Sequence, residues 1–134
     1  MTSSSILDDF RKEHRHIETE LTACEVLSAE VEQLTERLKA LRPMLLQHLD
    51  AKDAFYQRLV ALHVERGDVQ GAQRARSLAE SAKVESDALR RFFNALDGGS
   101  SPLLPQSFKT LAHVIRRRLE TEERAAFPLY PEHG

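Results

Sequence analysis

The sequence predicts an all-α protein that folds as an up-down-up-down antiparallel four-helix bundle. Apolar residues recur at spacings of three and four along most of the chain, which is the period of a helix with one buried face. Strand-like alternation is almost absent. Residues typical of helix ends divide the chain into four periodic segments with short connections, and such connections favour antiparallel neighbours.

The first predicted helix runs from possible N-caps at residues 3–5 to about residue 26. The second begins near residue 30, behind a possible cap at Ser28, and contains Pro43, which predicts a kink or a late start. The core-facing positions of the first helix are Leu7, Phe10, His14, Ile17, Leu21 and Cys24. Those of the second helix are Leu34, Leu38, Leu41, Leu45, His48, Lys52, Phe55, Leu59 and Leu62.

The third predicted helix follows Gly67-Asp68, which ends the second helix and caps the third, and it stops at residues 97–99. The fourth runs from about Gln106 to Ala126. The core-facing positions of the third helix are Ala75, Leu78, Ala82, Glu85, Leu89, Phe92 and Leu96. Those of the fourth are Phe108, Leu111, Ile115, Arg118, Glu122 and Ala125.

Length and charge restrict the class of protein. The 134 residues have room for one domain, which we take to be residues 1–134. A formal charge of −2 gives no global attraction to nucleic acid or to an anionic membrane. Because no apolar run approaches the roughly 20 residues of a membrane span and no secretory leader is recognisable, we expect a cytoplasmic protein that binds neither nucleic acid nor membrane.

Polar residues interrupt the buried face of every predicted helix. The segments HLDAKDAFYQRL (48–59) and RLETEERAAFPL (118–129) echo each other, and both place charged residues where a bundle buries leucine. A buried charge must be compensated by a metal, a counter-charge or a bound group. We therefore predict a polar core layer formed by His14, His48, Lys52, Glu85, Arg118 and Glu122.

The chain resembles the hemerythrin-like (HHE cation-binding) four-helix bundle family. The resemblance rests on three motifs, His14-Arg15-His16-Ile17, His48-Leu49 followed by Asp53, Phe55 and Tyr56, and Glu122-Glu123 followed by Ala126-Phe127-Pro128-Leu129. It implies a bundle with a non-haem di-iron centre. The family's ligands are histidines on helices one and three, and a histidine followed four residues later by glutamate on helices two and four.

Several positions depart from the family's pattern. Lys52 stands where the bridging glutamate belongs, and Arg118 stands where the histidine of the fourth helix belongs. The third helix has no histidine and carries Glu85 or Ser86 at the corresponding point. The resemblance therefore leaves at most His14, His48 and Glu122, a two-histidine, one-carboxylate set for a single iron or zinc.

Electrostatics favours the loss of the metal. A divalent ion would lie close to Lys52 and Arg118, and repulsion in a low-dielectric layer opposes its binding. The same two cations formally cancel Glu85 and Glu122, so we predict a buried salt-bridge layer and no metal or other cofactor. One alternative is that both cations reach solvent and leave no such layer.

We therefore expect a non-enzymatic module with a regulatory or partner-binding role, whose partner is another protein. Lys52 could in principle act as a nucleophile or base, but no partner constellation is visible for it. The competing interpretation is a single iron or zinc held by His14, His48 and Glu122, which senses oxygen, nitric oxide or metal as relatives are thought to do.

Overall fold

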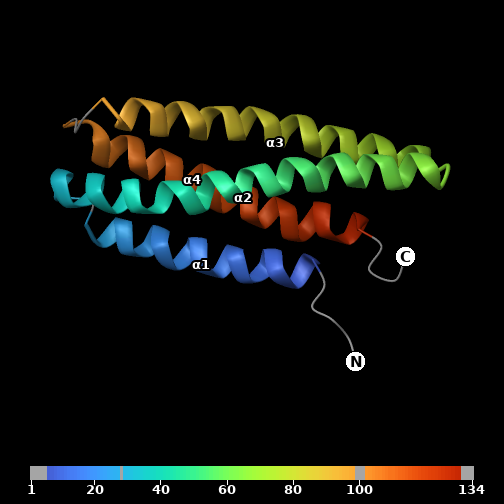
Figure 1. Cartoon of the computed structure of the whole chain (residues 1–134), viewed down its shortest axis with the longest axis horizontal. Coiled ribbons are helices and arrows are strands. Elements are labelled where there is room, and N and C mark those ends of the chain that lie inside the picture. Colours follow the sequence, from blue (N-terminus) through green and yellow to red (C-terminus); the bar gives the residue numbers. More distant parts are fainter. Residues whose placement is uncertain (1–5, 28, 99–101, 131–134) are drawn as a thin grey trace.

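The protein forms four long helices that run alternately up and down along one axis (Figure 1). The computed structural model describes residues 6–27, 29–98 and 102–130. The helices are α1 (Ile6–Val26), α2 (Val31–Glu65), α3 (Val69–Leu96) and α4 (Leu104–Thr121), and α4 continues into a π-helical turn, η1 (Glu122–Ala126), and a 3-10 turn, η2 (Phe127–Leu129). The predicted all-α four-helix bundle is confirmed. None of the helices described combines the length and apolar character of a membrane span.

The helix ends lie close to those predicted. Asp68 caps α3 by accepting a hydrogen bond from the backbone of Gly71, and Gly67, at φ 70°, supplies the left-handed turn before it. The helix α4 begins at Leu104 rather than at Gln106, because Pro105 is tolerated in a first turn, where its missing donor is not needed. The chain is helical on both sides of Pro43, so the late start is wrong. The caps predicted at residues 3–5 and 28 lie outside the described residues.

Contacts of His63 connect the α2–α3 turn, at one end of the bundle, to the end of η2. The two nitrogens of His63 contact Asp68 Oδ2 at 3.0 Å and the carbonyl oxygen of Leu129 at 2.8 Å. A Cβ atom at Gly71 would overlap both His63 and Asp68, so glycine is required for this close approach. At this end α2 and α3 project beyond α1 and α4 (Figure 1).

A layer of buried polar residues divides the core into two hydrophobic clusters. The polar layer consists of His14, His48, Lys52, Ser86, Arg118 and Glu122. On one side lies the leucine cluster, which contains Ile17, Leu21, Leu34, Leu38, Leu41, Leu45, Leu89, Leu96, Leu111 and their neighbours. On the other side lies the aromatic cluster, which contains Leu7, Phe10, Phe55, Tyr56, Leu59, Ala75, Ala82, Ala126 and Phe127.

All residues predicted to face the core are buried in α1. In α2 the same is true of every predicted residue except Leu62, which is half-exposed. In α3 the predictions for Leu78, Glu85 and Phe92 are wrong, because all three are half-exposed. The structure buries Ser86 and Phe93 in place of Glu85 and Phe92. Small side chains at Ala82 and Ser86 face the core here and let the guanidinium of Arg118 reach the backbone of α3. In η1 the wider π turn buries Ala126 in place of the predicted Ala125.

Candidate functional site

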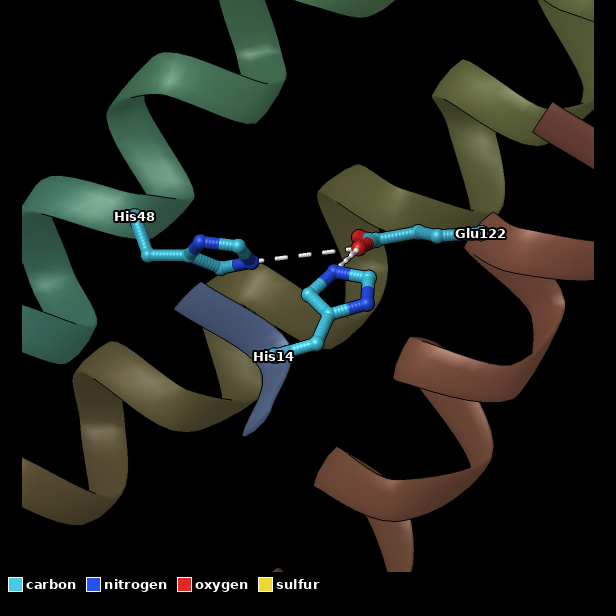
Figure 2. A group of neighbouring side chains, drawn as sticks. All are labelled: His14, His48 and Glu122. Carbon is cyan, nitrogen blue, oxygen red and sulfur yellow. Dashed lines mark hydrogen bonds and ion pairs between the residues drawn. The ribbon is translucent and has the colours of Figure 1, made fainter. Parts of the chain in front are cut away.

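Two histidines and one glutamate from three helices converge in the middle of the core (Figure 2). His14 comes from α1, His48 from α2 and Glu122 from the first position of η1. All three are buried, and one ligand atom of each lies within 4.8 Å of the other two. Nε2 of His14 is 2.7 Å from Oε1 of Glu122, and Nε2 of His48 is 3.8 Å from the same oxygen. This geometry could hold one cation.

Each histidine is oriented by a surface carboxylate on its outer side. Nδ1 of His14 lies 2.7 Å from Oε2 of Glu123, and Nδ1 of His48 lies 2.5 Å from Oε1 of Glu13. These contacts turn both Nε2 atoms inward, as in metal-binding histidines whose second nitrogen is held by a carboxylate. Neither glutamate is predicted as a histidine partner from helical periodicity, because each directly follows or precedes a core residue and such neighbours point about 100° apart around a helix. The feature of the sequence that could have indicated these contacts is that Glu13 directly precedes His14 and Glu123 directly follows Glu122.

The ammonium group of Lys52 lies against two of the three candidate ligand atoms. Its side chain is 0% exposed, and Nζ is 2.5 Å from Oε1 of Glu122 and 3.1 Å from Nε2 of His14. The rings of Phe10 and Phe127 also face Nζ, at 4.2 and 4.7 Å from their centroids. The buried charge is therefore compensated by a carboxylate and by two aromatic faces.

Arg118 bonds to the second carboxylate oxygen of Glu122. Its Nε donates to Oε2 of Glu122 at 3.0 Å, and its Nη1 donates to the carbonyl oxygen of Ala82 at 2.7 Å. Glu85 lies at the edge of the layer, where its Oε1 is 3.6 Å from the same Nη1 and its side chain is 22% exposed. Because Lys52 and Arg118 are both buried, the alternative that they reach solvent is wrong.

Glu122 is the fixed anion of the layer. Burial by itself would raise the pKa of Glu122, but the hydrogen bond with His14 and the charges of Lys52 and Arg118 outweigh it and hold this pKa well below its usual range. Burial lowers the pKa of Lys52, and the neighbouring Glu122 opposes this shift. Burial also raises the pKa of Glu85 against the charge of Arg118.

The layer is not fully satisfied. Among the described buried side chains, Nε2 of His48, Oγ of Ser86 and Nη2 of Arg118 have no hydrogen-bond partner. Buried donors and acceptors without partners are uncommon in folded proteins, and each one calls for a physical explanation. These three atoms therefore mark the places where the layer could accept a ligand atom or a water molecule.

The turn after α4 completes the site. In η1 the backbone N–H of Phe127 bonds to the carbonyl oxygen of Glu122, five residues earlier. This wider turn places the Phe127 ring parallel to the ring of His14, with centroids 5.5 Å apart and planes at 19°. The Ala126-Phe127-Pro128-Leu129 motif thus packs an aromatic ring over the histidine and the lysine of the layer.

Residues 5–130 match the family described as hemerythrin HHE cation binding domain. No curated protein and no solved structure gives a significant match to the chain. The family match covers nearly the whole sequence, and both the four-helix fold and the His-His-Glu cluster fit a cation-binding bundle. The chain therefore belongs to the hemerythrin HHE cation-binding domain family.

Proposed function

We propose that this member of the family has lost the di-iron centre and that the pairing of Lys52 and Arg118 with Glu122 replaces it. The observation that carries the proposal is the position of the Lys52 ammonium, which contacts both Glu122 and His14. Among the described residues, His14, His48 and Glu122 form the only group suited to a metal ion. Three ligands, one of them held by two cations, do not fit a pair of iron ions.

Electrostatics supports the same conclusion. A divalent ion between these three ligands would lie within a few ångströms of the Lys52 ammonium, which would repel it strongly in this buried layer. The negative charge of Glu122 is already paired with Lys52 and Arg118. Arginine keeps its proton at any relevant pH, so Arg118 would repel the ion even if Lys52 lost its charge. In this proposal the lysine and the arginine supply the positive charge that a metal would supply.

The proposed role of the protein is that of a non-enzymatic module that binds another protein or regulates it. A core that is held by its own ion pairs keeps one structure without a metal, which suits a binding scaffold. Exposed apolar residues support a protein partner: Val64 and Val69, which flank the α2–α3 turn at the projecting end, are 53% and 76% exposed.

Metal analysis of protein purified without chelator tests the loss of the di-iron centre. We expect well under one equivalent of iron or zinc, no oxo-bridged di-iron absorption in the near ultraviolet, and the same melting temperature with and without chelator. Lys52→Ala should bind added zinc more tightly than the parent, whereas Lys39→Ala on the exposed face of α2 should not. Two metals per chain in the parent would overturn the proposal.

A second candidate function is a sensor of oxygen, nitric oxide or metal that holds a single iron or zinc. Two observations favour it, the unpartnered Nε2 of His48 and the carboxylates that turn both histidines inward. The Lys52 ammonium would then have to leave the site. This candidate predicts one tightly held metal per chain, which His48→Ala abolishes and His16→Ala, on the exposed face of α1, preserves.

A further inference from the structure

A cavity of about 280 Å³ opens between α2 and α3, beside the polar layer. None of the three candidate metal ligands lines it. The side chains that carry polar groups into its walls include Asp53, Tyr56, Lys83, Ser86, Asp87 and Arg90. Sites for drug-sized ligands occupy roughly 300–1,000 Å³, so this cavity suits a smaller molecule.

Ser86 lines the cavity and carries a hydroxyl group that makes no hydrogen bond. Its side chain is 2% exposed, and Oγ has no hydrogen-bond partner. A serine within a helix commonly bonds to the carbonyl oxygen four residues earlier. Here that oxygen, on Ala82, already accepts a hydrogen bond from Arg118. A ligand that supplies a donor or acceptor to Ser86 would therefore remove an unfavourable feature of the protein alone.

Tyr56 offers a second hydroxyl group from the opposite helix. The residue is 3% exposed, and burial raises the pKa of its phenol, which therefore stays neutral at physiological pH. A neutral phenol can both donate and accept a hydrogen bond. The two most buried polar residues that line the cavity thus carry uncharged hydroxyls, one from α2 and one from α3.

The charged groups around the cavity balance each other. Asp53 and Asp87 carry two negative charges, and Lys83 and Arg90 carry two positive charges. Arg90 is already engaged, since its Nη2 donates to Asp50 at 2.7 Å and lies 3.8 Å from Asp53. No net charge therefore selects an anion or a cation. Carboxylates that accept and an ammonium that donates are instead suited to the hydroxyl groups of a ligand.

We propose that the cavity between α2 and α3 binds a small uncharged molecule with several hydroxyl groups, of the size of a pentose, a hexose or a cyclitol. One ligand hydroxyl bonds to Ser86 and Tyr56, and others bond to Asp87 and Lys83. The proposal goes beyond the function proposed above and holds whether or not the His-His-Glu group takes a metal.

Tyrosine fluorescence provides the test, because the chain has two tyrosines and no tryptophan. In a Tyr130→Phe protein, Tyr56 alone reports on the cavity. We expect ribose, glucose or myo-inositol to change its emission in a saturable way at millimolar concentration or below. Acetate and methylammonium at equal concentration should leave the emission unchanged. A saturable response to either ion, or to none of the three polyols, would overturn the proposal.

Ser86→Ala separates binding in the cavity from the general stabilisation of proteins by polyols. The substitution removes a buried hydroxyl without a partner, so the protein should remain folded. We expect the polyol to bind at least about tenfold more weakly, a change that corresponds to one good hydrogen bond. Ser81→Ala, on the exposed face of α3, is the matched control and should bind like the parent. Equal affinity of the two variants would show that Ser86 does not contact the ligand.

Discussion

The two hydrophobic clusters of the bundle are built differently. The leucine cluster consists mainly of aliphatic residues on regular α-helical positions of all four helices. The aromatic cluster combines Phe10, Phe55, Tyr56 and Phe127 with small residues and includes the π-helical and 3-10 turns that follow α4. Among the residues that the structure describes, the rings whose faces contact the Lys52 ammonium are those of Phe10 and Phe127, both in the aromatic cluster.

This difference shows how the core tolerates a buried charge. The leucine cluster provides apolar burial along regular helices, which is the general source of stability in a bundle. The aromatic cluster surrounds the polar layer with ring faces, which attract a cation while remaining apolar toward the rest of the core. We therefore expect variants of the layer and its aromatic neighbours to be coupled, and variants of the leucine cluster to be independent of them.

The largest effect is expected for Glu122→Ala. The substitution leaves Lys52 and Arg118 buried without their carboxylate, and breaking such a buried pair costs about 3–5 kcal/mol. Unfolding by denaturant measures the loss. Glu120→Ala, on the exposed side of α4, should change the free energy of unfolding by less than about 0.5 kcal/mol. A small effect at Glu122 would mean that its carboxylate does not compensate the buried charges of Lys52 and Arg118.

The contribution of Glu122 should also depend on pH. Because its folded pKa lies below the unfolded value of about 4.3, its stabilising effect is complete above that pH and declines as the pH falls through the folded pKa. The parent should thus lose stability at acid pH more steeply than Glu122→Ala. Leu45→Ala in the leucine cluster should shift the whole profile by a constant amount. Parallel profiles for the parent and Glu122→Ala would contradict the prediction.

A somewhat smaller effect, of about 3 kcal/mol, is expected for Arg118→Ala. Glu122 keeps its contact with Lys52 in this variant, but it loses the donor to its second oxygen, and Ala82 loses its guanidinium partner. The neighbouring Arg117 is exposed, so Arg117→Ala should stay within about 0.5 kcal/mol. Equal effects at the two arginines would show that the buried position of Arg118 is not important for stability.

The smallest effect is expected for Phe127→Leu, at about 1–2 kcal/mol, because a desolvated cation–π contact is lost while most of the volume is kept. A double-mutant cycle with Lys52→Met tests whether the ring acts through the charge. Most of the cost of Phe127→Leu should disappear when the lysine is absent. An unchanged cost would assign the effect to packing alone.

The sequence was sufficient to predict the bundle and most of its core. Regular spacing of apolar residues determines which face of a helix is buried, and all six positions predicted for α1 are buried. In α3 the pattern was ambiguous, because apolar residues such as Phe92 and Phe93 lie side by side and two registers fit equally well. The register that buries Ser86 is favoured by the hydrogen bond from the Arg118 guanidinium to the carbonyl oxygen of Ala82. This bond comes from another helix, so the periodicity of α3 alone does not predict it.

The sequence predicted which charged residues lie in the site, but it did not predict which of them contact each other. Lys52 and Arg118 stand on buried faces, yet the sequence left open whether they reach solvent. The structure pairs both with the same carboxylate. The outer contacts of Glu13 and Glu123 depend on how far a long side chain bends around its helix. Helical periodicity does not describe such bending, so these two residues were missed.

The π-helical turn has a consequence for variation in chain length. In η1 the hydrogen-bonded Glu122 and Phe127 are five positions apart in the sequence, whereas the bonded residues of an α-helix are four positions apart. Deleting Arg124, which is exposed, would convert the turn to α-helical spacing and leave the phenylalanine on the same face of the helix as Glu122. The segment should therefore accommodate the loss of one residue while its aromatic ring keeps its place in the core, a tolerance to deletion that the middle of α2 or α3 does not share.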